Sequence, residues 1–216
     1  MSSAPSPRIR LQRKPDRGLY ERAEIDAILD AGLICHVGYV IDGQPFVTPT
    51  SHWRVGGRVY WHGSSASRML RRLAEGLPAC LTVTHLDGIV LARSGYHHSM
   101  NYRSVMALGT ARAVEDPEEK EHALRDFMER LAPGRWDEVR PPTDGERKAT
   151  TVVWMDLDEA SAKVRIGPPG DDEADYALDC WAGVVPVSVV AGRPEADPRL
   201  RPGIPEPAYL RTMRVG

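Results

Sequence analysis

Small hydroxyl side chains lead into an arginine at the end of one predicted strand. Gly63 is followed by Ser64, Ser65 and Ser67, and a predicted helix then begins at Arg68. Serine hydroxyls can donate hydrogen bonds to phosphate oxygens, and a guanidinium can bind a phosphate through two hydrogen bonds. The free N–H groups of a first helical turn also favour an anion. The pattern indicates a candidate phosphate site, and an ordinary serine cap beside exposed arginines is the alternative.

A strand interrupted by prolines precedes this segment. Thr48, Pro49, Thr50 and Ser51 belong to it, and proline leaves backbone groups of a strand unpaired. Such a strand can lend its N–H and C=O groups to a planar heterocycle that lies along it. A plain edge strand protected by proline is the alternative.

Two histidines lie on strands that are predicted to pair around a turn at Gly56-Gly57. The pairing would place His52 and His62 close to opposite each other, so both could face one pocket and donate to an oxygen of a cofactor or substrate. Structural histidines are the alternative. The sequence has neither an H-x-x-x-H nor an H-E-x-x-H pair, and its three cysteines are far apart. We therefore expect no metal site.

The overall charge points away from several classes of partner. Twenty-eight Lys and Arg residues against 30 Asp and Glu leave a net charge of −2, so the sequence offers no basic footprint for nucleic acid or an anionic membrane. Its apolar runs are too short to cross a bilayer, and residues 1–14 lack the apolar core of a signal peptide. We expect a cytoplasmic globular protein.

The elements that must position these residues are mainly strands. A helix is predicted from Glu21 to a left-handed cap at Gly32, a hairpin turn at Asp42-Gly43, and a helix that starts at Asp116-Pro117. Further strands are predicted at 58–62, 78–86, 89–93 (after a turn at Asp87-Gly88), 104–114, 150–157, 162–166 and 181–190, with a loop at 140–145. Six to eight strands with a few short helices predict a mainly β, antiparallel, Greek-key-like barrel. We divide the chain into a flexible N-terminal arm (1–17), one domain (18–190) and a C-terminal tail (191–216).

The order of these motifs resembles the FMN-binding split-barrel family related to pyridoxamine 5′-phosphate oxidase, and within it the nitroimidazole-resistance-type, flavin-nucleotide-binding branch. The resemblance covers roughly residues 18–190. The matching segments are Thr48–Ser51, Tyr60–Ser64, Ser67–Leu70, Asn101–Val105, the DPEEK helix at residues 116–120 and Trp181–Pro186.

The resemblance implies a homodimer with FMN in a groove between the subunits. Thr48, Pro49, Thr50 and Ser51 would then border the flavin ring, and Ser64, Ser65, Ser67 and Arg68, after Gly63, would hold the phosphate. Tyr102, Arg103 and Ser104 would approach from near the subunit interface, and Trp181 would pack near the flavin, from either chain. Met69 follows Arg68 where the oxidase has a lysine, and its substrate-binding C-terminal arginine signature is not found. We therefore do not expect a vitamin B6 enzyme.

The function that this resemblance implies is an FMN-dependent oxidoreductase acting on a small organic molecule, in which the flavin carries the electrons. A flavin carrier, store or sensor without turnover is one alternative. The deazaflavin F420 or haem in place of FMN is another, with His52 or His62 as an axial ligand for haem.

Overall fold

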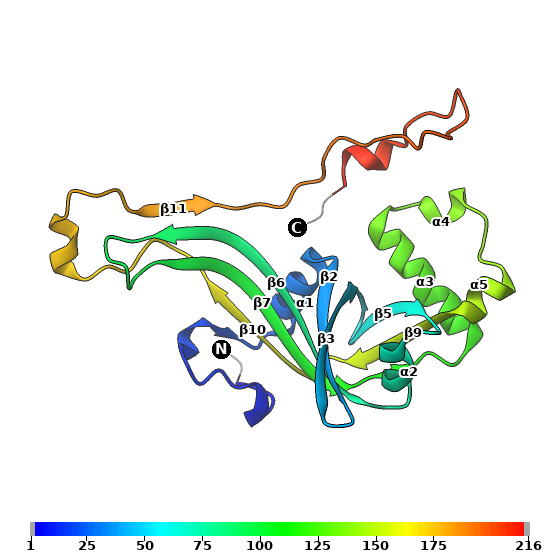
Figure 1. Ribbon diagram of the computed structural model, residues 1–216, viewed down its shortest axis with the longest axis horizontal. Helices are drawn as coiled ribbons and strands as arrows, with labels where there is room; N and C mark the ends of the chain where they lie inside the picture. Colours follow the sequence, from blue (N-terminus) through cyan, green and yellow to red (C-terminus); the bar gives the residue numbers. More distant parts are fainter. Residues whose placement is uncertain (1–2, 214–216) are drawn as a thin grey trace.

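The computed structural model describes residues 3–213, and two antiparallel sheets form the centre of this part of the chain (Figure 1). The first sheet has the order β1-β10-β7-β6-β2-β3, and β11 pairs with β6; the second has the order β4-β5-β9-β8. The strands are β1 Gly18–Leu19, β2 Ile34–Ile41, β3 Gln44–Ser51, β4 Trp53–Val55, β5 Arg58–Ser64, β6 Pro78–Leu91, β7 Ser99–Thr110, β8 Arg112–Ala113, β9 Thr150–Asp156, β10 Glu159–Arg165 and β11 Gly183–Pro186. The predicted mainly β, antiparallel class is confirmed.

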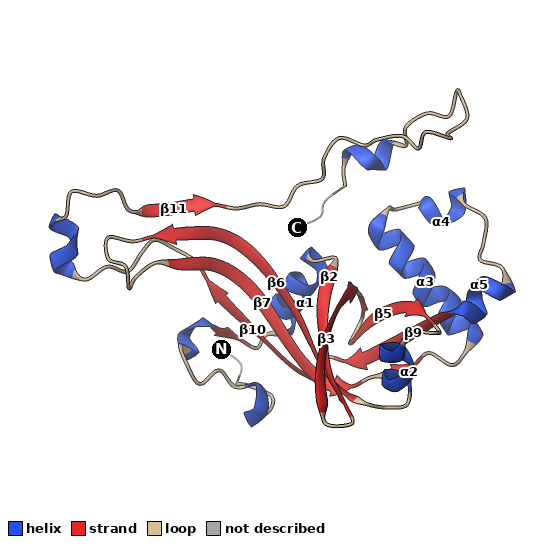
Figure 2. Ribbon diagram, in the orientation of Figure 1, coloured by secondary structure: helices blue, strands red, loops and turns tan. Residues whose placement is uncertain are grey.

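The helices pack around the two sheets (Figure 2). They are α1 Arg22–Ala31, α2 Arg68–Ala74, α3 Pro117–Leu131, α4 Arg135–Glu138 and α5 Asp144–Ala149. Helix α1 buries Ile25, Ile28 and Leu29 against the main core, as their helical spacing predicts. The main core lies between the two sheets, and a smaller cluster lies under α3 on the other face of the second sheet.

Local turn chemistry explains the first hairpin. Asp42 and Gly43 both have positive φ angles, 50° and 79°, as a two-residue hairpin turn requires. Ile41 pairs with Gln44 on either side of this turn. The turn fixes the register of β2 on β3. Strand β3 is the last strand of its sheet.

Three local predictions are wrong. Asp87-Gly88 is a bulge inside the continuous strand β6 and not a hairpin turn, because the pairing with β7 continues past a register shift at Leu86/Gly88. Gly32 ends α1 in an extended conformation, with φ −95°, and not in the left-handed region. Residues 144–145 of the expected loop begin α5, whose start is fixed by a capping box between Thr143 and Glu146.

The two ends of the described chain run along the surface. Near the N-terminus, Ile9 is 1 % exposed, and Arg8 forms an ion pair with Glu159 of β10. After β11 the chain continues as an extended strap toward α3 and α4 (orange to red in Figure 1). Near its end, Tyr209 accepts a hydrogen bond from Arg135 at 3.2 Å and donates one to Glu138 at 3.0 Å. The division into arm, domain and tail stays a prediction.

Candidate functional site

Arg68 lies beside the interrupted strand. Its guanidinium carbon is 4.4 Å from the centre of the Phe46 ring on β3, a cation–π contact between the start of α2 and that strand. Ser67 caps α2 by accepting a hydrogen bond from the Leu70 N–H. The Ser65 N–H donates to the Ala149 carbonyl at 2.8 Å, which fixes the turn before α2. The structure therefore brings the candidate phosphate residues next to the candidate ring-binding strand.

Strand β3 leaves one side unpaired within the described sheets. Its other side pairs with β2, and Thr48 faces Val37 while Thr50 faces Cys35. The Thr48 hydroxyl lies 3.1 Å from the Tyr39 hydroxyl, so one of its hydrogen bonds is already made. Val47, which precedes Thr48, is 68 % exposed. An exposed apolar edge with free backbone groups suits the predicted contact with a heterocycle, and that role stays a prediction.

Tyr102, Arg103 and Ser104 lie on β7, which β6 and β2 separate from β3. Arg103 donates two hydrogen bonds to Asp87, at 2.9 and 3.0 Å, and its guanidinium is therefore occupied. The Ser104 hydroxyl donates to the Lys163 carbonyl at 3.2 Å. A single chain does not bring these three residues together with β3.

Trp181 also lies apart from the interrupted strand. It precedes β11, which pairs with residues 88–91 of β6, past the part of β6 that pairs with β2, and it is 67 % exposed. Its ring packs over Gly183, where a Cβ atom would lie 2.9 Å from the indole. Neither Trp181 nor the β7 residues belong to a strand that pairs with β3 in this chain.

The expectation that His52 and His62 face one pocket is wrong. Trp53 pairs with Tyr60, so His62 lies on the face of Trp53 and Tyr60, and His52 points to the opposite face. His52 is 1 % exposed, and its Nε2 donates to the Leu29 carbonyl at 3.0 Å. Its Nδ1 is buried with no partner in the described chain, so a second proton there would be a buried charge. Burial lowers the pKa of His52 to about 4.

His52 is one of three side chains that bind the last carbonyls of α1. His85 on β6 bonds through Nε2 to the Ile28 carbonyl at 2.9 Å. Arg130 of α3 donates to the carbonyls of Asp30, at 2.7 Å, and of Gly32. These bonds satisfy groups that a helix end otherwise leaves unpaired. In this chain, the role of His52 is to hold α1 in place.

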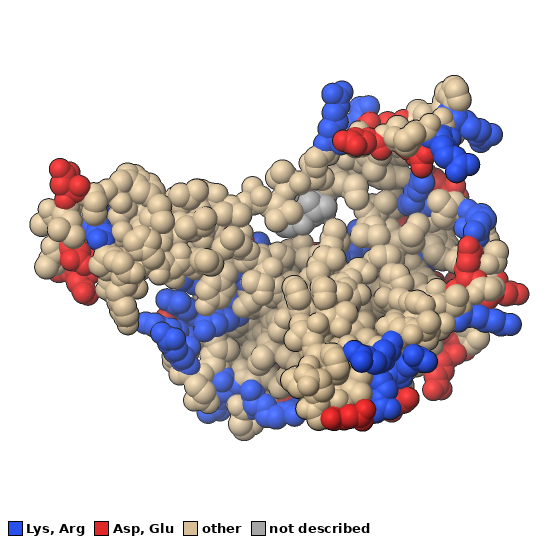
Figure 3. All heavy atoms as spheres, in the orientation of Figure 1, with Lys and Arg blue, Asp and Glu red and all other residues tan. Residues whose placement is uncertain are grey.

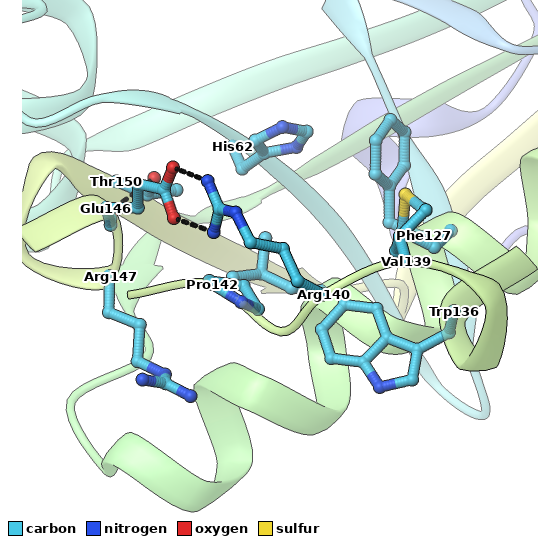
Figure 4. Close-up of a pocket in the computed structure, with 11 residues that line it drawn as sticks. His62, Phe127, Trp136, Val139, Arg140, Pro142, Glu146, Arg147 and Thr150 are labelled. Atoms are coloured by element: carbon cyan, nitrogen blue, oxygen red, sulfur yellow. Dashed lines mark hydrogen bonds and ion pairs between the residues drawn. The ribbon is translucent and has the colours of Figure 1, made fainter. Parts of the chain in front are cut away.

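His62 faces a pocket that the sequence analysis missed (Figure 4). The pocket has a volume of about 470 Å³. Its lining comes from β5, β9, the helices α3, α4 and α5, and the segment between α4 and α5. It consists of His62, Leu124, Phe127, Met128, Trp136, Val139, Arg140, Pro142, Glu146, Arg147 and Thr150. The helical spacing of Leu124, Phe127 and Met128 predicts an apolar face for α3, but it does not reveal that part of this face lines a cavity.

The imidazole of His62 is held between aromatic rings. Its centre lies 4.6 Å from the Phe127 ring and 5.6 Å from the Trp53 ring. Its Nδ1 is buried and has no hydrogen-bond partner among residues 3–213. Burial lowers the pKa of His62, so the ring is neutral at pH 7 and keeps a lone pair.

Charged side chains form the rim of the His62 pocket. Arg140 donates to both carboxylate oxygens of Glu146, at 2.6 and 2.7 Å (dashed in Figure 4). These bonds, followed by those from Thr143, lower the pKa of Glu146 to about 2. Arg147 forms ion pairs with Glu121 and Asp144, each at 3.1 Å. The guanidinium groups of two lining residues thus already bind carboxylates.

Comparison with known proteins identifies the family. The model of the pyridoxamine 5′-phosphate oxidase family matches residues 21–164. The chain belongs to this family. The predicted resemblance is confirmed, although among curated proteins none matches this chain.

Two solved structures of similar proteins extend the comparison over the whole chain. The flavocytochrome Anf3 from Azotobacter vinelandii is 46 % identical, with a TM-score of 0.95 and 100 % of both chains covered. The FAD and haem binding protein from Mycobacterium smegmatis is 37 % identical, with a TM-score of 0.88; 92 % of this chain and 98 % of that chain are covered.

A third structure shares the fold at lower identity. It is a candidate 5-nitroimidazole antibiotic resistance protein from Bacteroides thetaiotaomicron, 24 % identical, with a TM-score of 0.56 over 68 % of this chain and 86 % of that chain. Together with the family match, these structures confirm the split-barrel class expected for this oxidase family.

A broad uncharged surface runs over the long strands of this split barrel (Figure 3). Exposed apolar side chains of the strands include Val40 and Val47 on the first hairpin, and Ile89, Met100 and Val185 on β6, β7 and β11. Lys, Arg, Asp and Glu residues gather mainly around this surface in the view of Figure 3. Within residues 3–213, no helix is long and apolar enough to span a membrane.

Proposed function

We propose that the protein binds a flavin and uses it to exchange electrons with a small organic molecule. The observation that carries this proposal is the contact of Arg68 with Phe46, which places a cation and a row of serines beside strand β3 in a member of the pyridoxamine 5′-phosphate oxidase family. A flavin supplies the redox chemistry, and the protein supplies binding and orientation.

The local charges fit a flavin phosphate. Arg68 forms no ion pair within residues 3–213, so its charge is available to an anion. Ser64 accepts a hydrogen bond from the Ala66 N–H at 3.2 Å, and this leaves its hydroxyl proton free to donate. Met69 stands where the oxidase has its lysine, and Arg71 and Arg72 on α2 are the nearest further cations in the sequence.

FMN is the form that the sequence analysis predicts, and we propose it for this site. The FAD in the name of the Mycobacterium smegmatis protein favours FAD as the second candidate. Both flavins carry a phosphate on the ribityl chain, so the Arg68 site suits either. Mass spectrometry of the molecule that is released on denaturation distinguishes them, and F420 would differ from both in mass and fluorescence.

We further propose that two copies of the chain share the site. In one chain, β6 and β2 lie between β3 and the β7 residues Tyr102, Arg103 and Ser104. Trp181 precedes β11, which pairs with residues 88–91 of β6, past the part of β6 that pairs with β2. A partner docked on the uncharged surface would supply these residues to the flavin that β3 holds. The homodimer thus explains why the predicted contacts are divided between two regions.

The test of flavin binding combines a spectrum with one substitution. The purified protein should be yellow, and reduction should bleach its flavin absorbance. Arg68→Ala should weaken flavin binding by about 1.5–3 kcal/mol, the contribution of a hydrogen bond to a charged group. Arg125→Ala, which removes an exposed arginine of α3, is the matched control. Equal affinity in the Arg68 variant and the wild type would refute the phosphate assignment.

Turnover separates an oxidoreductase from a carrier. An enzyme should oxidise NADH, NADPH or a small organic donor faster than free flavin does. Bound flavin without such acceleration would instead support the carrier, store or sensor that the sequence analysis leaves open.

A second cofactor is favoured by one specific observation. The flavocytochrome Anf3 is 46 % identical to this protein over the full length of both chains. We therefore propose that the chain also binds haem, beside the flavin and not in its place. A Soret band in addition to flavin absorbance is the expected result.

A further inference from the structure

We infer that the pocket beside His62 is the haem site and that His62 is an axial ligand of the iron. This inference rests on the proposed presence of haem and assigns it a place in the fold.

The pocket has the size and lining of a cofactor site. Its volume of about 470 Å³ lies within the usual range for bound small molecules. Phe127 and Trp136 contribute flat aromatic surfaces, and Leu124, Met128 and Val139 add aliphatic surface. A flat and largely apolar molecule matches such walls better than a sugar or an inorganic ion does.

A single neutral imidazole such as that of His62 suits a metal ion whose other ligands come mainly from a cofactor. His62 is the one imidazole in the lining of this pocket, and a bare ion such as zinc needs three or four protein donors. Porphyrin supplies four nitrogens and leaves an axial position for a side chain such as histidine. Nδ1 of His62 is buried, so Nε2 is the nitrogen that remains for the iron.

The ring of His62 is also oriented before any ligand binds. Phe127 and Trp53 contact it in edge-on arrangements, each with an interplanar angle of 62°. A side chain held by its neighbours loses little freedom on binding, which strengthens the bond that it makes.

The rim provides cations for acidic groups. Arg140 and Arg147 both line the pocket, and each binds carboxylates of the protein. Haem carries two propionate carboxylates, which can take the place of Glu146 or Asp144 in these pairs. The geometry of the Arg140–Glu146 pair shows that the guanidinium can offer two hydrogen bonds to one carboxylate.

The pocket shares a strand with the proposed flavin site. His62 and Ser64 both belong to β5 and are two residues apart, so they lie on the same face of the sheet. Ser64 pairs with Thr150, which lines the pocket. A haem here would lie close to the phosphate end of the flavin without competing for β3.

The decisive variant is His62→Gly, with imidazole added from outside. The full chain is purified with haem present during expression, and haem and flavin are quantified separately. The wild type should contain both. His62→Gly should lose the Soret band or shift it while it keeps its flavin, and added imidazole should restore the wild-type spectrum. His122→Gln, which changes an exposed histidine of α3 outside the pocket, should resemble the wild type.

A second variant tests the cavity without changing the proposed iron ligand, His62. Val139→Trp should fill the slot, and it should lower the haem content while the flavin content and the far-ultraviolet dichroism stay unchanged. This variant keeps the inference testable if His62→Gly does not fold.

The outcomes separate the inference from the proposed function. An unchanged Soret band in His62→Gly would overturn the assignment of His62 and leave the flavin proposal standing. Flavin without haem in the wild type, after incubation with haemin, would overturn the haem site. A wild type that binds neither group would overturn the proposed function itself.

Discussion

At the scale of single residues, one step in register decides the chemistry of two histidines. Trp53 opposite Tyr60 turns His52 toward α1 and His62 toward α3. His52 donates to a backbone carbonyl and fastens a helix, whereas His62 lies between aromatic rings at the edge of a cavity. We therefore expect changes at His52 to affect stability and changes at His62 to affect binding.

The buried state of His52 predicts a loss of stability in mild acid. Its pKa is about 4 in the folded chain and near 6.5 when it is exposed. The unfolded state therefore binds the proton more readily between pH 6.5 and 4, and stability falls as the pH decreases through this window. Proton uptake by His52 in the unfolded state should lower the free energy of unfolding by about 2 kcal/mol between pH 7 and pH 5. The slope is about 1.4 kcal/mol per pH unit below pH 6.5.

Urea denaturation at the two pH values measures this effect. His52→Gln can keep a hydrogen bond to Leu29 but has no group that titrates there, so its stability should depend less on pH. His122→Gln, at an exposed position, should keep the wild-type dependence. The same loss in His52→Gln as in the wild type would show that another group is responsible; burial of His62 acts in the same direction.

At the scale of elements, a glycine sets how closely the two sheets approach. A Cβ atom on Gly109 of β7 would lie 2.5 Å from the Met155 Cγ on β9. Met155 is completely buried in the main core, so it has little room to move. The close approach of β7 and β9 therefore depends on the absence of a side chain at residue 109.

Gly109→Ala should destabilise the fold by about 1–3 kcal/mol, because extra atoms in a packed core force their neighbours to shift. The control is Gly57→Ala, where no atom lies within 4 Å of the added Cβ. The free energies of unfolding of both variants, measured in urea, give the comparison. Equal values would mean that β7 and β9 can separate at little cost.

Elements with strong local signals could be predicted from the sequence. Asp42-Gly43 specifies a hairpin by itself, and Asp116-Pro117 begins α3 where the sequence indicates, with Asp116 accepting from the Glu119 N–H at 2.8 Å. Asp87-Gly88 carries a similar local signal but lies in a long strand, because pairing with β7 on one side and β11 on the other outweighs the preference for a turn. Tertiary pairing of this kind has no local signature.

The residues of the candidate site also differ in whether the sequence alone could reveal them. Arg68 and the serines before it could be found because helix starts and phosphate ligands are local patterns. The His62 pocket could not, because α3, α4, α5 and β5 must first come together to line it. The capping box of Thr143 and Glu146 is a local signal for α5. It lies in a segment that also contains two prolines and a glycine, and these residues favour a loop.

At the scale of the whole molecule, the uncharged surface predicts self-association. Exposed apolar side chains that gather on one surface mark an interaction site in a soluble protein. Sedimentation should give about twice the chain mass of 23.9 kDa. Val47→Glu would place a charge on this surface and should shift the protein toward the monomer.

The control for Val47→Glu is Arg125→Glu on α3, which should sediment as the wild type does. A monomeric wild type that still binds flavin tightly would contradict the shared site. A dimeric Val47→Glu variant with normal flavin content would instead place the contact elsewhere on the molecule.

Two prolines on β3 limit how two copies of the chain could associate. Pro45 and Pro49 belong to the outermost strand of the first sheet and have no hydrogen to donate. A neighbouring molecule therefore cannot extend this sheet by adding a regular strand to that edge, and stacking into fibres is blocked there. Copies of the chain must instead meet through their side chains, which keeps the main chain of β3 accessible to small molecules.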